Sequence, residues 1–223
     1  MTDEDGGRLR HSKAEAPKVL LSEQERAECE ARNALLQAKR LEEMIDAYVL
    51  EPERPFRLRP SIILELNRLA IDGLDAFAGN WRPGSVEISG SKHQPPDAHL
   101  VPELIEQLCD YINDNWKRRA THLAAYAMWR MNWIHAFTDG NGRTARAVSY
   151  LVLSVRLHMK IPGDPTIPEM IIDNRKPYYD ALEEADKSLG GGQIDLTAME
   201  ALLEELLAKQ LLTIVSEASG NDY

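Results

Sequence analysis

The sequence of 223 residues predicts an all-α protein, a helical bundle with one small β element. Apolar residues recur at helical spacing along most of the chain, whereas only Ser85–Ser89 alternates apolar and polar side chains in a short run next to turn residues. Two long apolar patterns, Ala120–Ile134 and a second that continues to about His158, flank a short polar join. This arrangement predicts a helix, a loop and a helix at the centre of the chain.

The N-terminal part of the chain precedes this centre as a separate helical extension. Residues 1–21 are polar and charged, which predicts disorder. Ser22 followed by Glu25 is a capping-box pattern, which predicts a helix from there through Ala47. A linker punctuated by prolines, 51–60, then leads into the main domain. The expected parts are a disordered N-terminus at 1–21, the N-terminal helix and linker at 22–60, the main domain at 61–190, and a C-terminal helix and tail at 191–223.

The rest of the chain reads as helices separated by turn residues. Glycine and prolines around Gly163 predict a loop, and three glycines at 190–192 predict a break. Apolar residues on the last helix could face either the core or a dimer partner, so the sequence leaves a homodimer open. These residues are Leu203, Leu206, Leu207 and Leu211. The further helices are expected at 61–77, 101–116, 120–134, 175–187 and 196–215.

The composition excludes some classes of partner. A net charge of −10 argues against nucleic acid, which requires a basic surface. No apolar run approaches the roughly 18 residues of a membrane span, and residues 1–15 lack the apolar segment of a secretory signal. The two cysteines, Cys29 and Cys109, cannot form a disulfide framework. We therefore expect a cytoplasmic protein with no membrane partner.

The polar join carries residues that suit a phosphate group. Gly140, Asn141 and Gly142 all tolerate positive φ, so their N–H groups can converge on an anion. The helix that follows points its unpaired N–H groups and its positive dipole end at the same place. Arg143 and Arg146 share a face of its first turn, and two guanidinium groups suit several phosphates better than one. The join therefore predicts a polyphosphate site.

Two further side chains of the join suggest a reaction. A carboxylate beside phosphate would be repelled, so Asp139 suggests a Mg²⁺ ion that bridges carboxylate and phosphate oxygens. A role as a plain helix cap is the alternative for this residue. His135 precedes the loop and can act as a general base near neutral pH. Together these residues predict transfer of a phosphorus group from a nucleotide to a hydroxyl.

The stretch from His135 to Arg146 resembles the signature of the Fic (filamentation induced by cAMP) family, His-x-Phe-x-Asp/Glu-Gly-Asn-Gly-Arg-x-x-Arg. Every specified position is met, including Phe137, which the resemblance implies points inward and anchors the loop. The related Doc branch, which uses the pocket as a kinase, carries Lys where Gly142 stands. The resemblance therefore implies the Fic fold, with the Fic domain at 61–190, and favours the nucleotidyl-transfer branch.

The resemblance also implies a role for each residue of the loop. His135 would deprotonate a target hydroxyl, which attacks the α-phosphate of ATP, and Asp139 would hold Mg²⁺ between the α- and β-phosphates. Arg143 would contact the β-phosphate region and Arg146 the γ-phosphate. The protein then looks like a protein adenylyltransferase, which transfers AMP to a Ser, Thr or Tyr of a target protein, and also of itself, and releases pyrophosphate. The residues implied to form the anion hole are Gly140, Asn141 and Gly142.

Two other segments resemble parts of the family site. The predicted strand resembles the Fic flap, a hairpin over the active site whose exposed edge aligns an extended target segment by strand addition. A helical stretch with Tyr178 and Tyr179 resembles the helix that bounds the adenine site, although core packing is an equal alternative for both tyrosines. Asp186 stands in that stretch where relatives often have Asn. The flap residues are Val86, Glu87, Ile88 and Ser89.

Several alternatives stay open at the level of sequence. Removal of AMP, or transfer of another phosphate-containing group, needs nearly the same pocket. A catalytically idle interaction module is the alternative from another class. Many Fic proteins carry an inhibitory helix with the motif Ser/Thr-x-x-x-Glu-Gly/Asn, whose Glu pairs with the second arginine of the signature. This sequence has no clean copy of the motif, and Glu28 and Glu30 are the nearest candidates for pairing with Arg146. The sequence therefore does not decide between self-inhibition, a separate inhibitory protein and an unrestrained enzyme.

Overall fold

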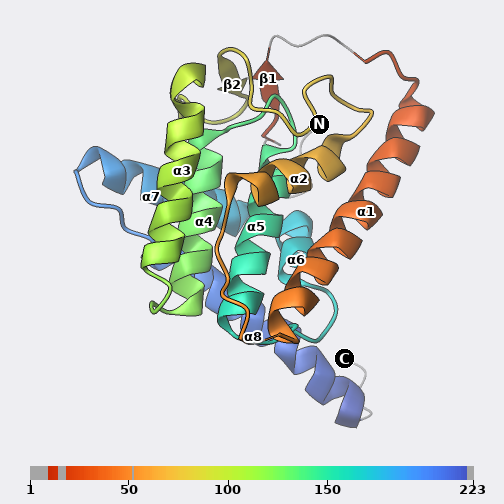
Figure 1. The fold of residues 1–223 in the computed structure, drawn as a ribbon, viewed down its shortest axis with the longest axis vertical. Helices are drawn as coiled ribbons and strands as arrows, with labels where there is room; N and C mark the ends of the chain where they lie inside the picture. Colours follow the sequence, from red (N-terminus) through yellow and green to blue (C-terminus); the bar gives the residue numbers. More distant parts are fainter. Residues whose placement is uncertain (1–9, 15–18, 52, 220–223) are drawn as a thin grey trace.

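The computed structural model describes residues 10–14, 19–51 and 53–219, and Figure 1 shows their arrangement. Within these residues the fold is a bundle of α-helices with one tiny two-stranded sheet, which confirms the predicted all-α class. In chain order the elements are β1 (Ser12–Ala14), α1 (Glu23–Val49), α2 (Pro60–Ile71), β2 (Val86–Ile88), the 3₁₀ turn η1 (Ala98–Leu100), α3 (Val101–Asp114), α4 (Ala120–Ile134), α5 (Asn141–Arg156), α6 (Ile167–Asp173), α7 (Lys176–Gly190) and α8 (Thr197–Ser219).

Helix α5 lies at the centre of the bundle. It packs against α4 on one side and against α1, α2 and α6 on others, as its position between these ribbons in Figure 1 shows. Most residues of α4 and α5 are buried, and small side chains at their contact allow close approach. Ser149 on α5 donates a hydrogen bond to the carbonyl of Ala124 on α4 (2.9 Å). The two helices that flank the polar join are therefore held firmly along their length.

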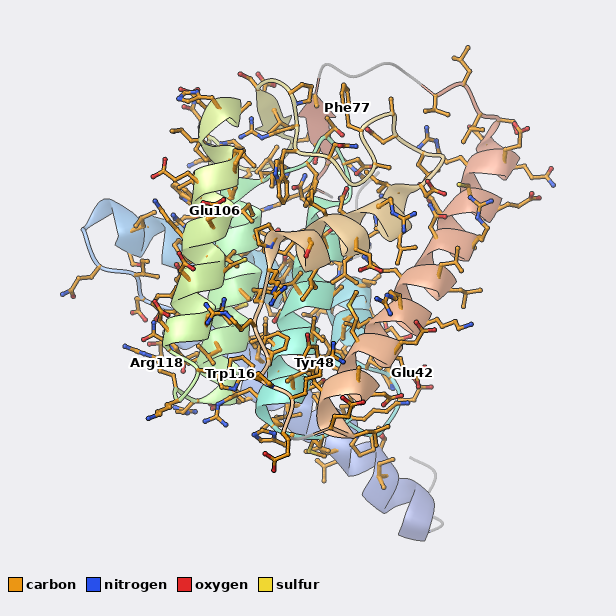
Figure 2. The ribbon with its side chains drawn as sticks, viewed as in Figure 1. Glu42, Tyr48, Phe77, Glu106, Trp116 and Arg118 are labelled. Carbon is orange, nitrogen blue, oxygen red and sulfur yellow. The ribbon has the colours of Figure 1, made fainter. Side chains whose placement is uncertain are left out.

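The N-terminal helix α1 is packed into the body of the protein. It begins with the expected capping box between Ser22 and Glu25, and residues such as Met44 and Ile45 belong to the main core. The linker that follows is also anchored, because the Phe56 ring lies between Tyr48 and Trp116, with ring centroids 5.0 and 4.8 Å away. Figure 2 shows Tyr48 and Trp116 at the end of the bundle opposite the small sheet.

Two local expectations differ from the structure. The loop predicted around Gly163 contains the short helix α6, which begins with a capping box between Thr166 and Glu169. Helix α2 ends at Ile71 instead of Phe77, because the chain turns at Gly73 with a φ of +72°.

The small sheet differs most from expectation. Within the described residues strand β2 is not part of a hairpin; it pairs antiparallel with β1, so that Ser12 lies opposite Ile88. Residues 12–14 thus form a strand where the sequence predicted disorder, whereas 1–9 and 15–18 lie outside the described residues. The sheet therefore joins two segments that are remote in sequence, above the N-terminal end of α5 (Figure 1).

The C-terminal helix resolves one alternative. Leu203 and Leu206 are buried in the core, and Leu207 and Leu211 are half-buried against it, so all four pack within the chain. Leu212 on the same helix is exposed. None of the helices in the described segments combines the length and the apolar character needed to cross a membrane.

Candidate active site

The join between α4 and α5 is a tight loop held from inside. His135 adopts a left-handed backbone conformation (φ 50°, ψ 56°) as it ends α4, and Gly140 does so (φ 75°, ψ 7°) as it starts α5. The amide side chain of Asn141 accepts a bond from the N–H of Phe137 (3.0 Å) and donates one to its carbonyl (2.8 Å). Phe137 is fully buried beside Trp81, with centroids 5.2 Å apart. The loop geometry is thus fixed by its own asparagine and phenylalanine.

A buried arginine that the sequence reasoning missed holds the loop from outside. The guanidinium of Arg82 donates to the carbonyls of His135 (2.8 Å), Gly84 (2.7 Å) and Pro96. The backbone N–H of Arg82 also donates to the carbonyl of Ala136 (2.9 Å). Arg82 therefore connects the segment before β2 with the end of α4. No local sequence pattern predicts this contact.

A second missed residue, Asn67 on α2, supports the other end of the loop. It is fully buried, donates to the carbonyl of Asp139 (3.1 Å) and to Thr144 Oγ1 (3.3 Å), and accepts from the N–H of Gly79 (3.0 Å). A buried polar side chain must find partners. An asparagine on the apolar face of a predicted helix was the one signal that could have found it.

A cavity of about 500 Å³ opens over the loop. Its volume lies within the range of small-ligand sites. Arginines outnumber carboxylates in its lining, so an acidic protein here presents local positive charge. The charged lining residues are Arg10, Arg26, Arg143, Arg146 and Arg175 with Glu30, Asp139 and Asp186.

The imidazole of His135 lines this cavity and is poised as a base. Its Nε2 atom lies 2.8 Å from Ser12 Oγ, and its Nδ1 atom lies 3.4 Å from the carbonyl of Asn132. With the proton on Nδ1, directed at that carbonyl, Nε2 is free to accept the hydroxyl proton. Burial lowers the pKa of His135 to about 4, so the ring is neutral at pH 7.

The first turn of α5 offers unused backbone donors. The N–H groups of Asn141, Gly142 and Arg143 find no acceptor among the described residues. The N–H of Gly140 differs, because it donates to Asp139 Oδ1 (2.6 Å). Of the glycine–asparagine–glycine run only Gly140 has positive φ, so the donors converge as a helix N-terminus and not as a nest of left-handed residues.

The two arginines of the signature differ in their surroundings. Arg143 donates to Asp139 Oδ2 (3.2 Å) and to the carbonyl of Ala70 (3.1 Å). Arg146 has no hydrogen bond or ion pair with any described residue, and burial lowers its pKa. A half-buried cation without a partner among the described residues is suited to pair with an anion that enters the cavity.

Asp139 is the carboxylate closest in sequence to these donors. About half of its side chain is exposed, and it lines the cavity. No group of three or more His, Cys, Asp or Glu side chains in the described segments is placed to hold a metal ion by itself. A single carboxylate is nevertheless the ordinary protein contribution to a Mg²⁺ ion that is held mainly by substrate phosphates and water.

The predicted adenine residues lie on α7 at the far wall of the cavity. Tyr178 is buried, which raises its pKa to about 12, and Tyr179 lies under the guanidinium of Arg10, 4.4 Å from its ring centroid. Asp186 lines the cavity but accepts a bond from the indole N–H of Trp129 (2.8 Å). His93 also lines the cavity, with its Nδ1 atom 4.0 Å from a carboxylate oxygen of Asp186.

Only some residues of the predicted flap and of the inhibitory candidates line the cavity. Ile88 on β2 lines the cavity, Glu87 is exposed and Val86 is buried away from it. Ser89 continues the sheet, because its N–H donates to the carbonyl of His11 (2.9 Å). Of the two acidic candidates on α1, Glu30 lines the cavity, whereas Glu28 accepts a bond from Gln24 (2.8 Å).

Comparisons with known proteins identify the family that this part of the chain resembles. The model of the family described as Fic/DOC matches residues 57–153. Over 127 residues, 56% of this chain, the sequence is 30% identical to protein adenylyltransferase fic-1 of Caenorhabditis elegans, and over 129 residues, again 56%, it is 32% identical to protein adenylyltransferase Fic of Drosophila willistoni. The matches cover only 23% and 24% of those proteins, so the chain spans about a quarter of the length of these relatives.

Two solved structures share the fold. One is Fic-1 from C. elegans (TM-score 0.67, 22% identity, 90% of this chain and 54% of that chain). The other is a Fic domain containing signaling protein from Bacteroides thetaiotaomicron (TM-score 0.64, 26% identity, 85% of this chain and 73% of that chain). Residues 57–153 therefore match the Fic/DOC family, and the resemblance seen in the sequence is confirmed.

The two glycines of the loop are expected to fail differently when replaced. A Cβ at Gly140 would lie 2.8 Å from Ile71 Cγ2 on α2, at a φ of +75°. Gly140→Ala should therefore lower the free energy of unfolding by at least about 2 kcal/mol. Gly142 has no positive φ, and its Cβ would meet only the flexible end of Arg146 (3.2 Å). Gly142→Ala should leave stability within about 0.5 kcal/mol, and urea unfolding of both variants tests the contrast.

The low pKa of His135 predicts a pH effect on stability. In the folded protein the pKa is about 4 against an ordinary value of 6.5, so between these pH values the unfolded chain binds the extra proton. Stability should therefore fall as the pH drops from 6.5 to 4, with this group contributing on the order of 3 kcal/mol. The free energy of unfolding, measured at several pH values across this range, should change less with pH for His135→Gln than for wild type. His99→Asn, at an exposed position, is the matched control, and equal slopes for all three proteins would contradict the burial of a neutral imidazole.

Proposed function

We propose that this chain is a protein adenylyltransferase, which transfers AMP from ATP to a Ser, Thr or Tyr hydroxyl of a protein and releases pyrophosphate. The observation that carries the proposal is Arg146, which has no partner among the described residues and lines the same cavity as a neutral imidazole and three backbone amides that find no acceptor there. These groups match a triphosphate beside an attacking hydroxyl better than they match an interaction surface. The names of the adenylyltransferases similar to this chain support the same reaction.

The residues of the loop would divide the work between binding and proton transfer. The free amides at the start of α5 and the guanidinium of Arg146 would bind the phosphates. Arg143, which donates to Asp139, would also contact a phosphate when the nucleotide is bound. Nε2 of His135 would accept the proton of the incoming hydroxyl. Asp139 would hold Mg²⁺, which supplies neutralisation of phosphate charge when bound. Adenine would lie toward Tyr179 on α7.

Transfer of label tests the reaction. Wild-type protein incubated with Mg²⁺ and ATP labelled at the α-phosphate should place label on protein, and His135→Ala should lose most of it, because Nε2 of His135 is the nitrogen that lies against a hydroxyl in the cavity. ATP labelled at the γ-phosphate should leave the protein unlabelled. Label from the γ-position would instead indicate a kinase, and equal labelling of His135→Ala would contradict the role of the imidazole. His99→Ala is the control for loss of a histidine elsewhere.

Substitution of Arg146 separates a ligand-binding arginine from a structural one. Because this half-buried cation has no partner among the described residues, Arg146→Met should leave the stability of the free protein unchanged or higher. The same variant should bind ATP about tenfold or more weakly, since it loses a charge-assisted contact. Calorimetric ATP titration and thermal unfolding measure the two effects, with the exposed Arg57→Ala as control. Lost stability with unchanged ATP affinity would contradict the proposal.

A further inference from the structure

The chain places one of its own hydroxyl groups against the imidazole. Ser12 Oγ lies 2.8 Å from His135 Nε2, and Asn141 Nδ2 donates to the same oxygen (3.2 Å). With this donor occupying an oxygen lone pair, the hydroxyl hydrogen is left for the imidazole. The nucleophile, the base and a polar group that orients the nucleophile are thus within hydrogen-bond reach of one another before any ligand binds.

The segment that carries Ser12 is docked as an added strand. Ser12, Lys13 and Ala14 pair antiparallel with β2, and the carbonyl of His11 accepts a bond from the N–H of Ser89 (2.9 Å). Backbone pairing of this kind fixes which residue of an extended segment faces a given point. Here the register brings Ser12, and neither of its strand neighbours, to the imidazole.

The segment is also anchored across the cavity. The guanidinium of Arg10 forms an ion pair with Glu183 on α7 (2.7 Å) and lies over the ring of Tyr179, 4.4 Å from its centroid. The Arg10 side chain is only 13% exposed, whereas that of Glu183 is 48% exposed, so the arginine is held against the wall of the cavity by a partner that lies at its rim. Ser12 is therefore held from both sides, by the strand on one and by Arg10 on the other.

The docked segment leaves room for a nucleotide. The cavity of about 500 Å³ remains with Ser12 in place, and Ser12 lines it together with Gly142 and Arg146. A segment that merely blocked the site would be expected to fill the phosphate-binding region or to pair with Arg146. It does neither, since Arg146 has no partner among the described residues.

We propose that Ser12 is a self-modification site, which receives AMP from ATP within the same chain. This inference rests on the proposed function and names one of its substrates. The Ser12 oxygen forms a bond to the α-phosphorus, the bond from that phosphorus to the oxygen bridging to the β-phosphate breaks, and the hydroxyl proton passes to His135 Nε2. The products are an AMP diester on Ser12 and pyrophosphate, so atoms and charges balance without another reactant.

Site mapping tests the proposal. Full-length wild-type protein incubated with Mg²⁺ and α-labelled ATP should carry AMP on Ser12 in tandem mass spectra, and Ser12→Ala should lose this label. Ser85→Ala, an exposed serine next to β2 that does not line the cavity, should label like wild type. Because the reaction is intramolecular, the first-order rate constant should stay unchanged when the protein is diluted.

A charge exchange tests the docking itself. Lys13 lies opposite Glu87 in the register, and both are exposed. Lys13→Glu places like charges across the strands and should slow labelling of Ser12 by roughly threefold. The double variant Lys13→Glu with Glu87→Lys should restore the wild-type rate. A rate insensitive to both changes would contradict docking through β1 and β2.

The outcomes also separate this inference from the proposed function. A synthetic peptide of residues 8–16 should accept AMP from the Ser12→Ala protein, which shows that the variant keeps its activity. Label on the peptide or on other residues, with Ser12 of wild type unlabelled, would overturn the self-modification site and leave the adenylyltransferase standing. If Ser12→Ala labels the peptide faster than wild type does, and wild-type Ser12 carries no AMP, the segment that contains Ser12 blocks the site instead. No label on any protein or peptide would overturn both.

Discussion

The structure of the site depends on the side chain of Asn141, which pairs with both backbone groups of Phe137. The chain must reverse between two buried helices over six residues, and irregular backbone inside a protein needs hydrogen-bond partners. One amide at the start of α5 supplies both. These two bonds tie the end of the loop that carries His135 to the N-terminus of α5, whose N–H groups find no acceptor among the described residues. The distance between the base and the phosphate-binding groups is therefore fixed.

Electrostatics reinforce this geometry at a cost to stability. The protein is acidic, yet its cavity gathers five arginines, and the half-buried Arg146 has no partner in the described part of the chain. Such an arrangement opposes folding and favours binding of a polyanion, which is the usual mark of a site selected for a ligand. The neutral His135 follows from the same burial, because removal of water disfavours a charged imidazole beside other cations.

Much of this site could be anticipated from local spacing. The residues from His135 to Arg146 are neighbours in sequence, so a helix, a loop and a helix suffice to bring them together. The supporting residues Arg82 and Asn67 come from other elements and make their contacts across the fold. The sequence reasoning missed both, since periodicity reports which face of a helix is apolar and not which distant carbonyl a buried side chain will meet.

The sequence by itself determined the helical class and the chemistry of the loop, because both depend on residues within a few turns of one another. Only the tertiary structure decided what lies against the loop. Strand β1 pairs with β2 although Ser12 and Ile88 are remote in sequence, and Ser12 reaches His135 across 123 positions. Backbone pairing is indifferent to most side chains, so a three-residue strand leaves almost no trace in the sequence until a folded edge is present to receive it.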